Sequence, residues 1–193
     1  MRLVATEYLS LDGVFEEPGR WSGPFFNDEA GEFKLAELRA SDAQLLGRRT
    51  YEAFAAAWPS MTDEAGFAEK MNSMPKYIVT STLDTLDWPG SKPVRGELAD
   101  EVRGLKEQRG ADLLLAGSGQ LFRALMRHDL IDVYRFMVHP IVLGEGARLF
   151  PEGAGGVGGA GAVDGSGGRP LRLTGTQTFT SGVVVLEYVP DGS

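Results

Sequence analysis

Residues 112–126 read DLLLAGSGQLFRALM, and this stretch contains signals for a strand, a turn and a helix in that order. Residues 112–116 are so apolar that we expect a strand in the centre of a sheet, covered on both faces. The GSG triplet at 117–119 supplies the turn, and the apolar residues that follow, up to Met126, have the spacing of one helix face. A strand that leads through a glycine turn into a helix predicts an α/β fold.

On both sides of this unit the chain alternates between strand and helix signals. Strands are expected over residues 3–9, 43–47 and 76–80 with a short one around Val94, and helices over residues 27–39, 51–57, 98–108 and 119–126. After residue 130 the alternation ends, and the pattern indicates one long strand over 131–142 and a hairpin of 171–179 with 183–189. We therefore expect a mixed, mainly parallel sheet flanked by helices on both faces, with a C-terminal antiparallel hairpin.

The composition fits a single domain. Its 193 residues contain 19 Lys and Arg against 27 Asp and Glu, which gives a formal net charge of −8. A chain of this length buries roughly 70% of its unfolded surface as one domain, so we expect one domain over residues 1–193. Nine of the 26 glycines fall within residues 153–168. Because no strand signal leads into this run and no helix signal leaves it, we expect a flexible insertion there and not a phosphate-binding loop.

Composition also argues against several classes of function. The absence of cysteine excludes a disulfide framework and a thiolate nucleophile and is typical of a reducing compartment. Two histidines, His128 and His139, are too few for a histidine metal centre, so no metal is expected. The negative charge opposes binding to nucleic acid, and Arg2 and Glu7 interrupt the apolar N-terminal stretch that a secretory signal requires. No apolar run approaches the roughly 20 residues of a membrane span, and we expect a cytoplasmic protein that acts on a small molecule.

Three polar segments follow predicted strands and are candidate sites for an anion. Residues 47–51 (GRRTY) and 117–121 (GSGQL) lie where a strand ends and a helix begins, so backbone N–H groups and a positive helix end face the same edge of the sheet. Thr80, Ser81 and Thr82 add three hydroxyls at that edge. Neither glycine segment is a Walker or dinucleotide-binding motif, and each segment alone is equally well a structural turn. Their gathering at one edge predicts a phosphate-bearing ligand.

Acid and base groups are scarce in this sequence. Proton transfer near neutral pH usually uses histidine or a carboxyl group with a raised pKa. His139 lies in an apolar run and is expected to pack as a hydrogen-bonded strand residue, whereas His128 is expected as an exposed charge at a helix end. Asp12 and Glu29 are carboxyl candidates, although a turn and a helix N-terminus would explain them equally well. The chain offers no nucleophile with a base beside it, which favours chemistry in which a cofactor supplies the reactive atom.

Short motifs occur in a fixed order along nearly the whole chain: SLDG at 10–13, LGRRTYE at 46–52, TST at 80–82, AGSGQL at 116–121, VHP at 138–140, LGEG at 143–146, LFP at 149–151 and FTSGVV at 179–184. In this order and spacing they resemble the dihydrofolate-reductase-like superfamily. The branch that they resemble contains the reductase domain of bacterial riboflavin biosynthesis, the RibD C-terminal domain. The resemblance implies the same mixed, mainly parallel sheet that the apolar patterns predict.

The resemblance implies NADPH as the cofactor. It places the phosphates at Gly47, Arg48, Arg49 and Thr50, and Arg48 is the arginine expected to pair with the 2′-phosphate. It places the adenosine along Thr80, Ser81 and Thr82, the pyrophosphate at Gly117, Ser118, Gly119, Gln120 and Leu121, and the nicotinamide near Val14.

The resemblance also bears on the substrate. Dihydrofolate reductases carry an acid four residues before a Phe and a basic residue, and Glu29 stands in that place. They also carry a threonine that bonds this acid and the pterin, and Val138 stands there, so folate reduction is not expected. The SLDG motif is instead typical of riboflavin-type reductases, where the aspartate lies near the sugar part of the substrate. Asp12 and Glu29 are therefore the expected catalytic residues.

Two functions remain open at this point. The first is an NADPH-dependent reductase that transfers a hydride to a C=N or C=O bond of a small polar substrate, such as a pterin- or pyrimidine-like compound. It would be similar to 5-amino-6-(5-phosphoribosylamino)uracil reductase. The alternative is a non-catalytic ligand-binding module that has kept the nucleotide cleft of a reductase. The resemblance further implies a homodimer.

Overall fold

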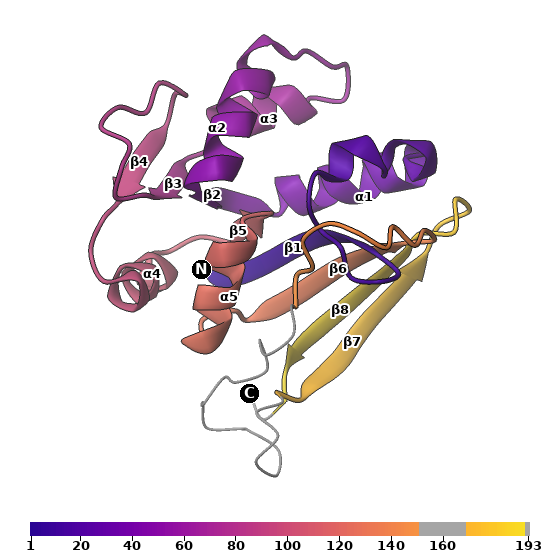
Figure 1. Ribbon diagram of the computed structural model, residues 1–193. Helices are drawn as coiled ribbons and strands as arrows, with labels where there is room; N and C mark the ends of the chain where they lie inside the picture. The colour runs from indigo at the N-terminus through magenta and orange to yellow at the C-terminus, as the bar shows by residue number, and fades with distance from the viewer. Residues whose placement is uncertain (151–168, 192–193) are drawn as a thin grey trace.

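The computed structural model describes residues 1–150 and 169–191, and the strands within these ranges form one eight-stranded sheet (Figure 1). In spatial order the strands are β4-β3-β2-β5-β1-β6-β8-β7. Their bounds are β1 Arg2–Ser10, β2 Ser41–Gly47, β3 Lys76–Val79, β4 Ser91–Val94, β5 Asp112–Ala116, β6 Val133–His139, β7 Leu171–Thr178 and β8 Val184–Pro190. Neighbours from β4 to β6 pair in parallel, and β8 pairs antiparallel with both β6 and β7. The prediction of a mixed, mainly parallel sheet with a C-terminal antiparallel hairpin is confirmed.

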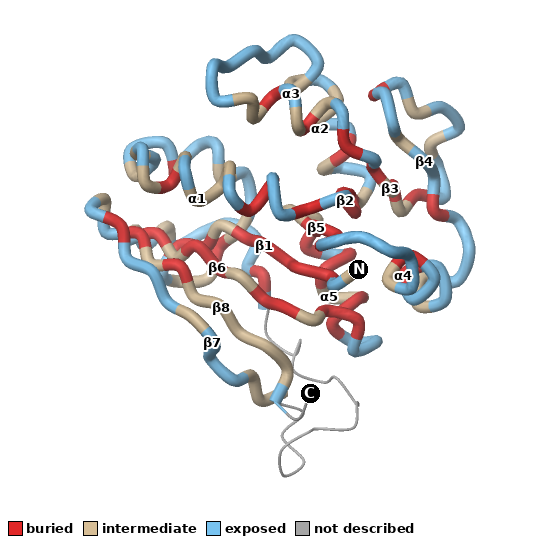
Figure 2. Tube along the Cα trace, turned by 180° about the vertical axis from the view of Figure 1, so that it is seen from behind, coloured by how far each residue is buried: buried red, intermediate tan, exposed pale blue. Residues whose placement is uncertain are grey.

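Helices cover both faces of this sheet. They are α1 Asp28–Arg39, α2 Arg48–Ala57, α3 Phe67–Ser73, α4 Leu98–Glu107 and α5 Gly119–Arg127, with short 3-10 turns at Pro18–Arg20, Gly23–Phe25 and Trp58–Ser60. On one face, Leu38 of α1 and Met71 of α3 belong to the same core cluster as Val4 of β1. On the other face, Phe122 of α5 shares a cluster with Leu3 of β1. Alternate residues of β1 thus enter different cores, and Figure 2 shows the buried residues concentrated in the central strands.

Two elements differ from the sequence predictions. Helix α3 was not expected, and the N–H groups at its start, those of Phe67 and Ala68, donate to the carboxylate of Asp63 at 2.9 and 2.6 Å. The strand predicted over 131–142 is shorter, because β6 ends at His139 and the following Pro140 has no N–H to continue the ladder.

The structure confirms the expectation for both histidines. His139 is buried, and its Nδ1 lies 2.9 Å from the carbonyl oxygen of Met137 and 3.3 Å from that of Leu9. Burial lowers the pKa of His139, so the ring is neutral at pH 7. His128 is exposed at the C-terminal end of α5.

The chain changes direction between β1 and β5. The connection after β1 runs through α1 to β2 on one side, whereas the connection after β5 runs through α5 to β6 on the other. Pairing between β1 and β5 stops at Thr6 and Ala116, while β1 continues beside β6 as far as Ser10 and His139. A crevice therefore opens beyond Thr6, at the kind of switch point where α/β sheets bind ligands.

The predicted flexible insertion over 153–168 lies outside the described residues. Among the helices that the structure describes, none is long and apolar enough to cross a membrane. In the same residues, no group of three His, Asp or Glu side chains is placed to hold a metal ion.

Candidate active site

A cleft of about 1910 Å³ opens at this switch point. It exceeds the roughly 300–1,000 Å³ of a typical small-molecule site, so it has room for two ligands. Of the residues expected at a cofactor, those that line it are Gly47, Arg48, Arg49, Thr50, Thr80, Ser81, Thr82, Gly117, Ser118, Gly119, Gln120 and Leu121. Val14, Asp12 and Glu29 do not line it. The topology thus brings three distant polar loops to one cleft, and it leaves both expected acids outside.

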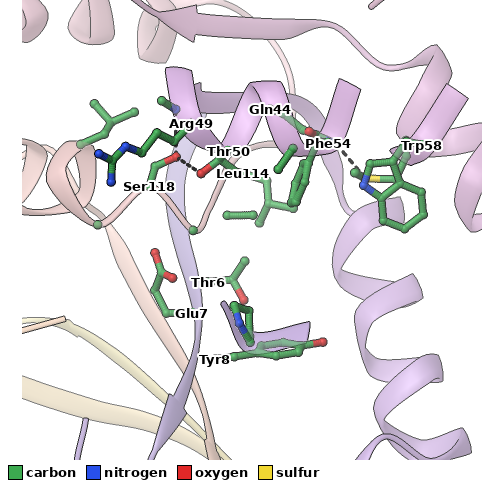
Figure 3. Close-up of a pocket in the computed structure, with 18 of the residues that line it drawn as sticks. Thr6, Glu7, Tyr8, Gln44, Arg49, Thr50, Phe54, Trp58, Leu114 and Ser118 are labelled. Atoms are coloured by element: carbon green, nitrogen blue, oxygen red, sulfur yellow. Dashed lines mark hydrogen bonds between the residues drawn. The ribbon is translucent and has the colours of Figure 1, made fainter. Parts of the chain in front are cut away.

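Ser118 joins two of these loops. Its side-chain oxygen accepts a hydrogen bond from the backbone N–H of Gly47 at 2.9 Å and donates one to Thr50 Oγ1 at 2.8 Å (Figure 3). Gly117 and Ser118 both have positive φ, at 62° and 66°, which turns the loop toward β2. A side chain at Gly47 would meet Ser118 Oγ at 3.1 Å. The Ser118 hydroxyl therefore fixes the spacing of the two loops.

Helices α2 and α5 begin at the cleft without side-chain caps. The N-cap residue of α2 is Gly47, which has no side chain, and that of α5 is Ser118, whose side chain does not bond to its own helix. The N–H groups of the first turns and the positive helix ends therefore remain available to an anion. A Cβ at Gly119 would lie 2.2 Å from the tip of the Phe15 ring, so any side chain there would displace that ring. Phe15 lines the cleft, and the preceding Val14 is buried.

The two arginines at the start of α2 have different surroundings. Arg48 forms an ion pair with Glu52 at 3.1 Å, and 45% of each side chain is exposed. A pair this exposed contributes at most about 1 kcal/mol and is easily exchanged for a ligand. Arg49 has no ion-pair or hydrogen-bond partner among the described residues, and it lies beside Thr50 and Ser118 in Figure 3. Both guanidinium groups are thus available for a phosphate.

The third loop is a hydroxyl turn. Thr80 Oγ1 accepts hydrogen bonds from the N–H groups of Thr82 and Leu83, each at 3.2 Å. Ser81 and Thr82 are exposed. Thr80 therefore shapes the loop, while its two neighbours present their hydroxyls to solvent at the cleft.

Asp12 connects the end of β1 to the loop after β6. Its carboxylate accepts hydrogen bonds from Ser10 Oγ at 2.7 Å and from the N–H groups of Leu143 and Gly144 at 3.1 and 2.9 Å. These bonds lower the pKa of Asp12 to about 2, so the carboxylate is ionised at neutral pH. The geometry supports the turn-building role of Asp12 and gives it no proton to donate.

Glu29 connects the first turn of α1 to the turn between β7 and β8. Its carboxylate accepts hydrogen bonds from the backbone N–H of Thr180 at 2.6 Å, from the Thr180 hydroxyl, and from Asn27 Nδ2 at 2.9 Å. The bonds to Thr180 are the main cause of a lowered pKa. Like Asp12, Glu29 holds two segments together outside the cleft.

Glu7 is a cleft residue that the sequence did not single out. It lies on β1, only 3% exposed, as the first residue beyond the last pair with β5. Burial raises the pKa of Glu7 to about 8, and the charges of Lys34 and Arg123 only partly oppose this. Its Oε1 is buried and has no hydrogen-bond partner. The sequence feature that could have pointed to Glu7 is its place in the apolar strand 3–9, because burying an unpaired charge is costly and such residues are rarely buried without a functional role.

On the opposite face of β1 lies a second buried carboxylate, Glu37, which has charged partners and can be compared with Glu7. Glu37 of α1 is buried but bonds to Lys34, and to Arg135 at 3.0 Å. Lys34 also donates to Thr6 Oγ1 at 3.2 Å. These partners lower the pKa of Glu37, against the effect of burial. Glu7 has no such set of partners.

Residues 2–185 match the RibD C-terminal domain family. The chain belongs to this family. It is 29% identical over 191 residues to the uncharacterized protein YyaP of Bacillus subtilis strain 168, which covers 97% of this chain and 94% of that protein. It is also 29% identical over 186 residues to YwjB of the same organism, with 94% and 93% coverage.

Solved structures share the fold at lower identity. A putative riboflavin biosynthesis protein from Shewanella sp. PV-4 has a TM-score of 0.73 at 18% identity, with 99% of each chain covered. Dihydrofolate reductase from Enterococcus faecalis with bound NADP(H) has a TM-score of 0.60 at 16% identity, with 98% and 96% covered. The deaminase/5-amino-6-(5-phosphoribosylamino)uracil reductase of Thermotoga maritima has a TM-score of 0.65 at 16% identity, and the match spans 98% of this chain but 56% of that one. The fold is therefore dihydrofolate-reductase-like, as the motifs implied.

Proposed function

We propose that this member of the RibD C-terminal domain family is an NADPH-dependent reductase that transfers a hydride to a C=N or C=O bond of a small polar, pterin- or pyrimidine-like compound. The observation that carries the proposal is the single cleft at the switch point, where two uncapped helix N-termini, two available arginines and a hydroxyl loop meet. Reductases of the same fold, one of them with NADP(H) bound, support it.

The residues present fit a phosphorylated dinucleotide. The N–H groups at the starts of α2 and α5 suit the pyrophosphate, and Gly119 keeps the α5 end free of a side chain. Arg49, beside the Ser118 junction of these helices, would contact the same pyrophosphate, and Arg48 would exchange Glu52 for the 2′-phosphate. When bound, the dinucleotide supplies the hydride. The remaining cleft, lined by Glu7, Tyr8 and other residues of β1 and α1, would receive the substrate.

A fluorescence titration with NADPH and NADH tests the cofactor assignment. Arg48→Ala should weaken NADPH binding at least tenfold, about 1.4 kcal/mol, and leave NADH unchanged, because only NADPH carries the 2′-phosphate. Arg49→Ala should weaken both cofactors by the same factor, because both carry the pyrophosphate. Equal affinity of the wild-type protein for NADH and NADPH would overturn the role of Arg48. No binding of either at tens of micromolar would overturn the proposal.

A turnover screen separates an enzyme from a binding module. NADPH oxidation would be followed with pterin-like, pyrimidine-like and ribosylamino compounds. We expect at least one class to be reduced. Tight NADPH binding without turnover of any class would instead favour a non-catalytic module.

A further inference from the structure

Glu7 lies between the part of the cleft proposed for the dinucleotide and the part proposed for the substrate. Beyond Thr6 and Ala116 the strands β1 and β5 separate, and Glu7 is the next residue of β1. Its side chain extends toward the loop of Ser118, whereas Thr6 and Tyr8 extend from the opposite face of β1 (Figure 3). Glu7 lines the cleft together with the loop of Ser118 and with Thr6 and Tyr8. A substrate beside a bound dinucleotide would therefore lie within its reach.

The surroundings of Glu7 keep a proton on it. Lys34 of α1 and Arg123 of α5 are the charged groups that act on it, and neither forms a hydrogen bond with its carboxyl group. Its partner in register on β6 is Phe136, which is apolar. The buried Oε1 has no partner in the described part of the chain. Desolvation therefore dominates, and it raises the pKa of Glu7 to about 8.

We propose that Glu7 is the proton donor of the reduction, with its protonated carboxyl group facing the nitrogen or oxygen of the substrate double bond. This inference rests on the proposed reductase function and deepens it. The hydride reaches the carbon of the C=N or C=O bond, the π electrons move to the heteroatom, and the Glu7 proton bonds to that atom. The cofactor is oxidised, the substrate is reduced to the amine or alcohol, and the carboxylate of Glu7 is reprotonated from water.

This assignment also narrows the substrate class. A neutral carboxyl group donates one hydrogen bond, so the reacting heteroatom must offer a lone pair. An imine nitrogen within a heterocycle or a carbonyl oxygen does so. A permanently cationic iminium compound becomes a neutral amine on accepting a hydride and needs no proton, so its reduction should not depend on Glu7.

Carbon-13 NMR of glutamate-labelled protein tests the protonation state without turnover. The Glu7 carboxyl resonance is identified by its loss in Glu7→Gln, and it is titrated in the free and NADP⁺-bound protein. We expect a midpoint near pH 8, well above the ordinary glutamate value. A midpoint at the ordinary value in both forms would overturn the proposal.

Turnover then tests the role, with the compound that is reduced fastest in the turnover screen described above as the probe. Glu7→Gln should lose at least about 100-fold in kcat while NADPH affinity changes less than twofold. Glu7→Asp should recover part of the rate, and the wild-type rate should fall above about pH 8. The matched control is Glu107→Gln, an exposed glutamate of α4 that does not line the cleft, which should behave as wild type.

The outcomes separate the two proposals. If Glu7→Gln binds NADPH and reduces the probe at the wild-type rate, Glu7 is not the donor although the reductase stands. If no probe is reduced, the reductase proposal fails, while the NMR titration still decides whether Glu7 holds the proton.

Discussion

Glu7 and Asp12 lie five residues apart, on β1 and in the turn that follows it, and their pKa values are displaced in opposite directions. Asp12 accepts three hydrogen bonds, which lower its pKa to about 2. Glu7 has an unpartnered oxygen in a buried position, which raises its pKa to about 8. The carboxyl group within the recognisable SLDG motif is therefore the one that cannot donate a proton at neutral pH, and the one outside the motif can.

The difference follows from what each carboxyl group faces. Asp12 lies where two loops need a common acceptor, so the ionised form is stabilised by N–H and O–H donors. Glu7 lies where β1 and β5 separate, and the donors that would satisfy it are absent from the described neighbourhood. A ligand in the cleft would supply the missing partner, which is why an unsatisfied buried group is informative about function.

The largest effect that would test this contrast is on stability as a function of pH. Glu7 has an unfolded pKa of 4.5 and a folded pKa of about 8, so the folded state binds the extra proton between these values. Wild-type stability therefore declines as the pH rises from 4.5 to about 8. Glu7→Gln lacks this term, and its free energy of unfolding should exceed that of the wild type by on the order of a few kcal/mol at pH 8, falling to about zero near pH 4.5.

Urea denaturation at a series of pH values measures this difference. Glu32→Gln is the control, because Glu32 is exposed and should give a constant difference from the wild type over the same range. A Glu7→Gln curve that runs parallel to the wild type from pH 4.5 to 8 would show that Glu7 is ionised in the folded protein, and the contrast with Asp12 would be lost.

Asp12→Asn should show the opposite dependence on pH. The folded pKa of Asp12 is lower than the unfolded value of 3.8, so its stabilisation is present above pH 3.8 and is lost as the pH falls toward 2. The variant should unfold at lower urea concentration than the wild type at pH 7, and the two midpoints should converge in acid. Midpoints that stay equally far apart from pH 7 to pH 2 would mean that the charge of Asp12 does not contribute.

The sequence was sufficient for the fold because the signals are local. Short sequence patterns predicted the apolar strand 112–116, the glycine turn after it and the helix that follows. Such units pair in parallel, and the rules for their connections leave few possible topologies. Helix α3 was missed because its start depends on Asp63, which accepts hydrogen bonds from the N–H groups four and five residues further along the chain, and apolar periodicity does not record such bonds.

The site was only partly predictable. The loops at 47–50 and 117–121 could be placed at one edge, because the ends of parallel strands meet there. The hydrogen bonds of Ser118 to Gly47 and Thr50 could not be predicted, because they depend on two residues with positive φ that bring distant loops together. The place of Glu7 in the cleft could not be predicted either, because it depends on where the pairing between β1 and β5 ends, and only the register of the sheet shows that.

The smallest expected effect concerns Glu29, the other acid that the family resemblance places in catalysis. Its carboxylate is already bound by Thr180 and Asn27, and it does not line the cleft. Glu29→Gln keeps an oxygen that can accept the Thr180 N–H, so NADPH affinity and the rate of probe reduction should change less than twofold, with a slight loss of stability that disappears in acid as the wild-type carboxylate is protonated. A tenfold loss of rate with unchanged cofactor binding would return the proton-donating or orienting role to α1. In that case Glu7 would have to act on the same substrate from the opposite side of β1, and Glu7→Gln combined with Glu29→Gln would show whether the two carboxyl groups share one step or serve separate ones.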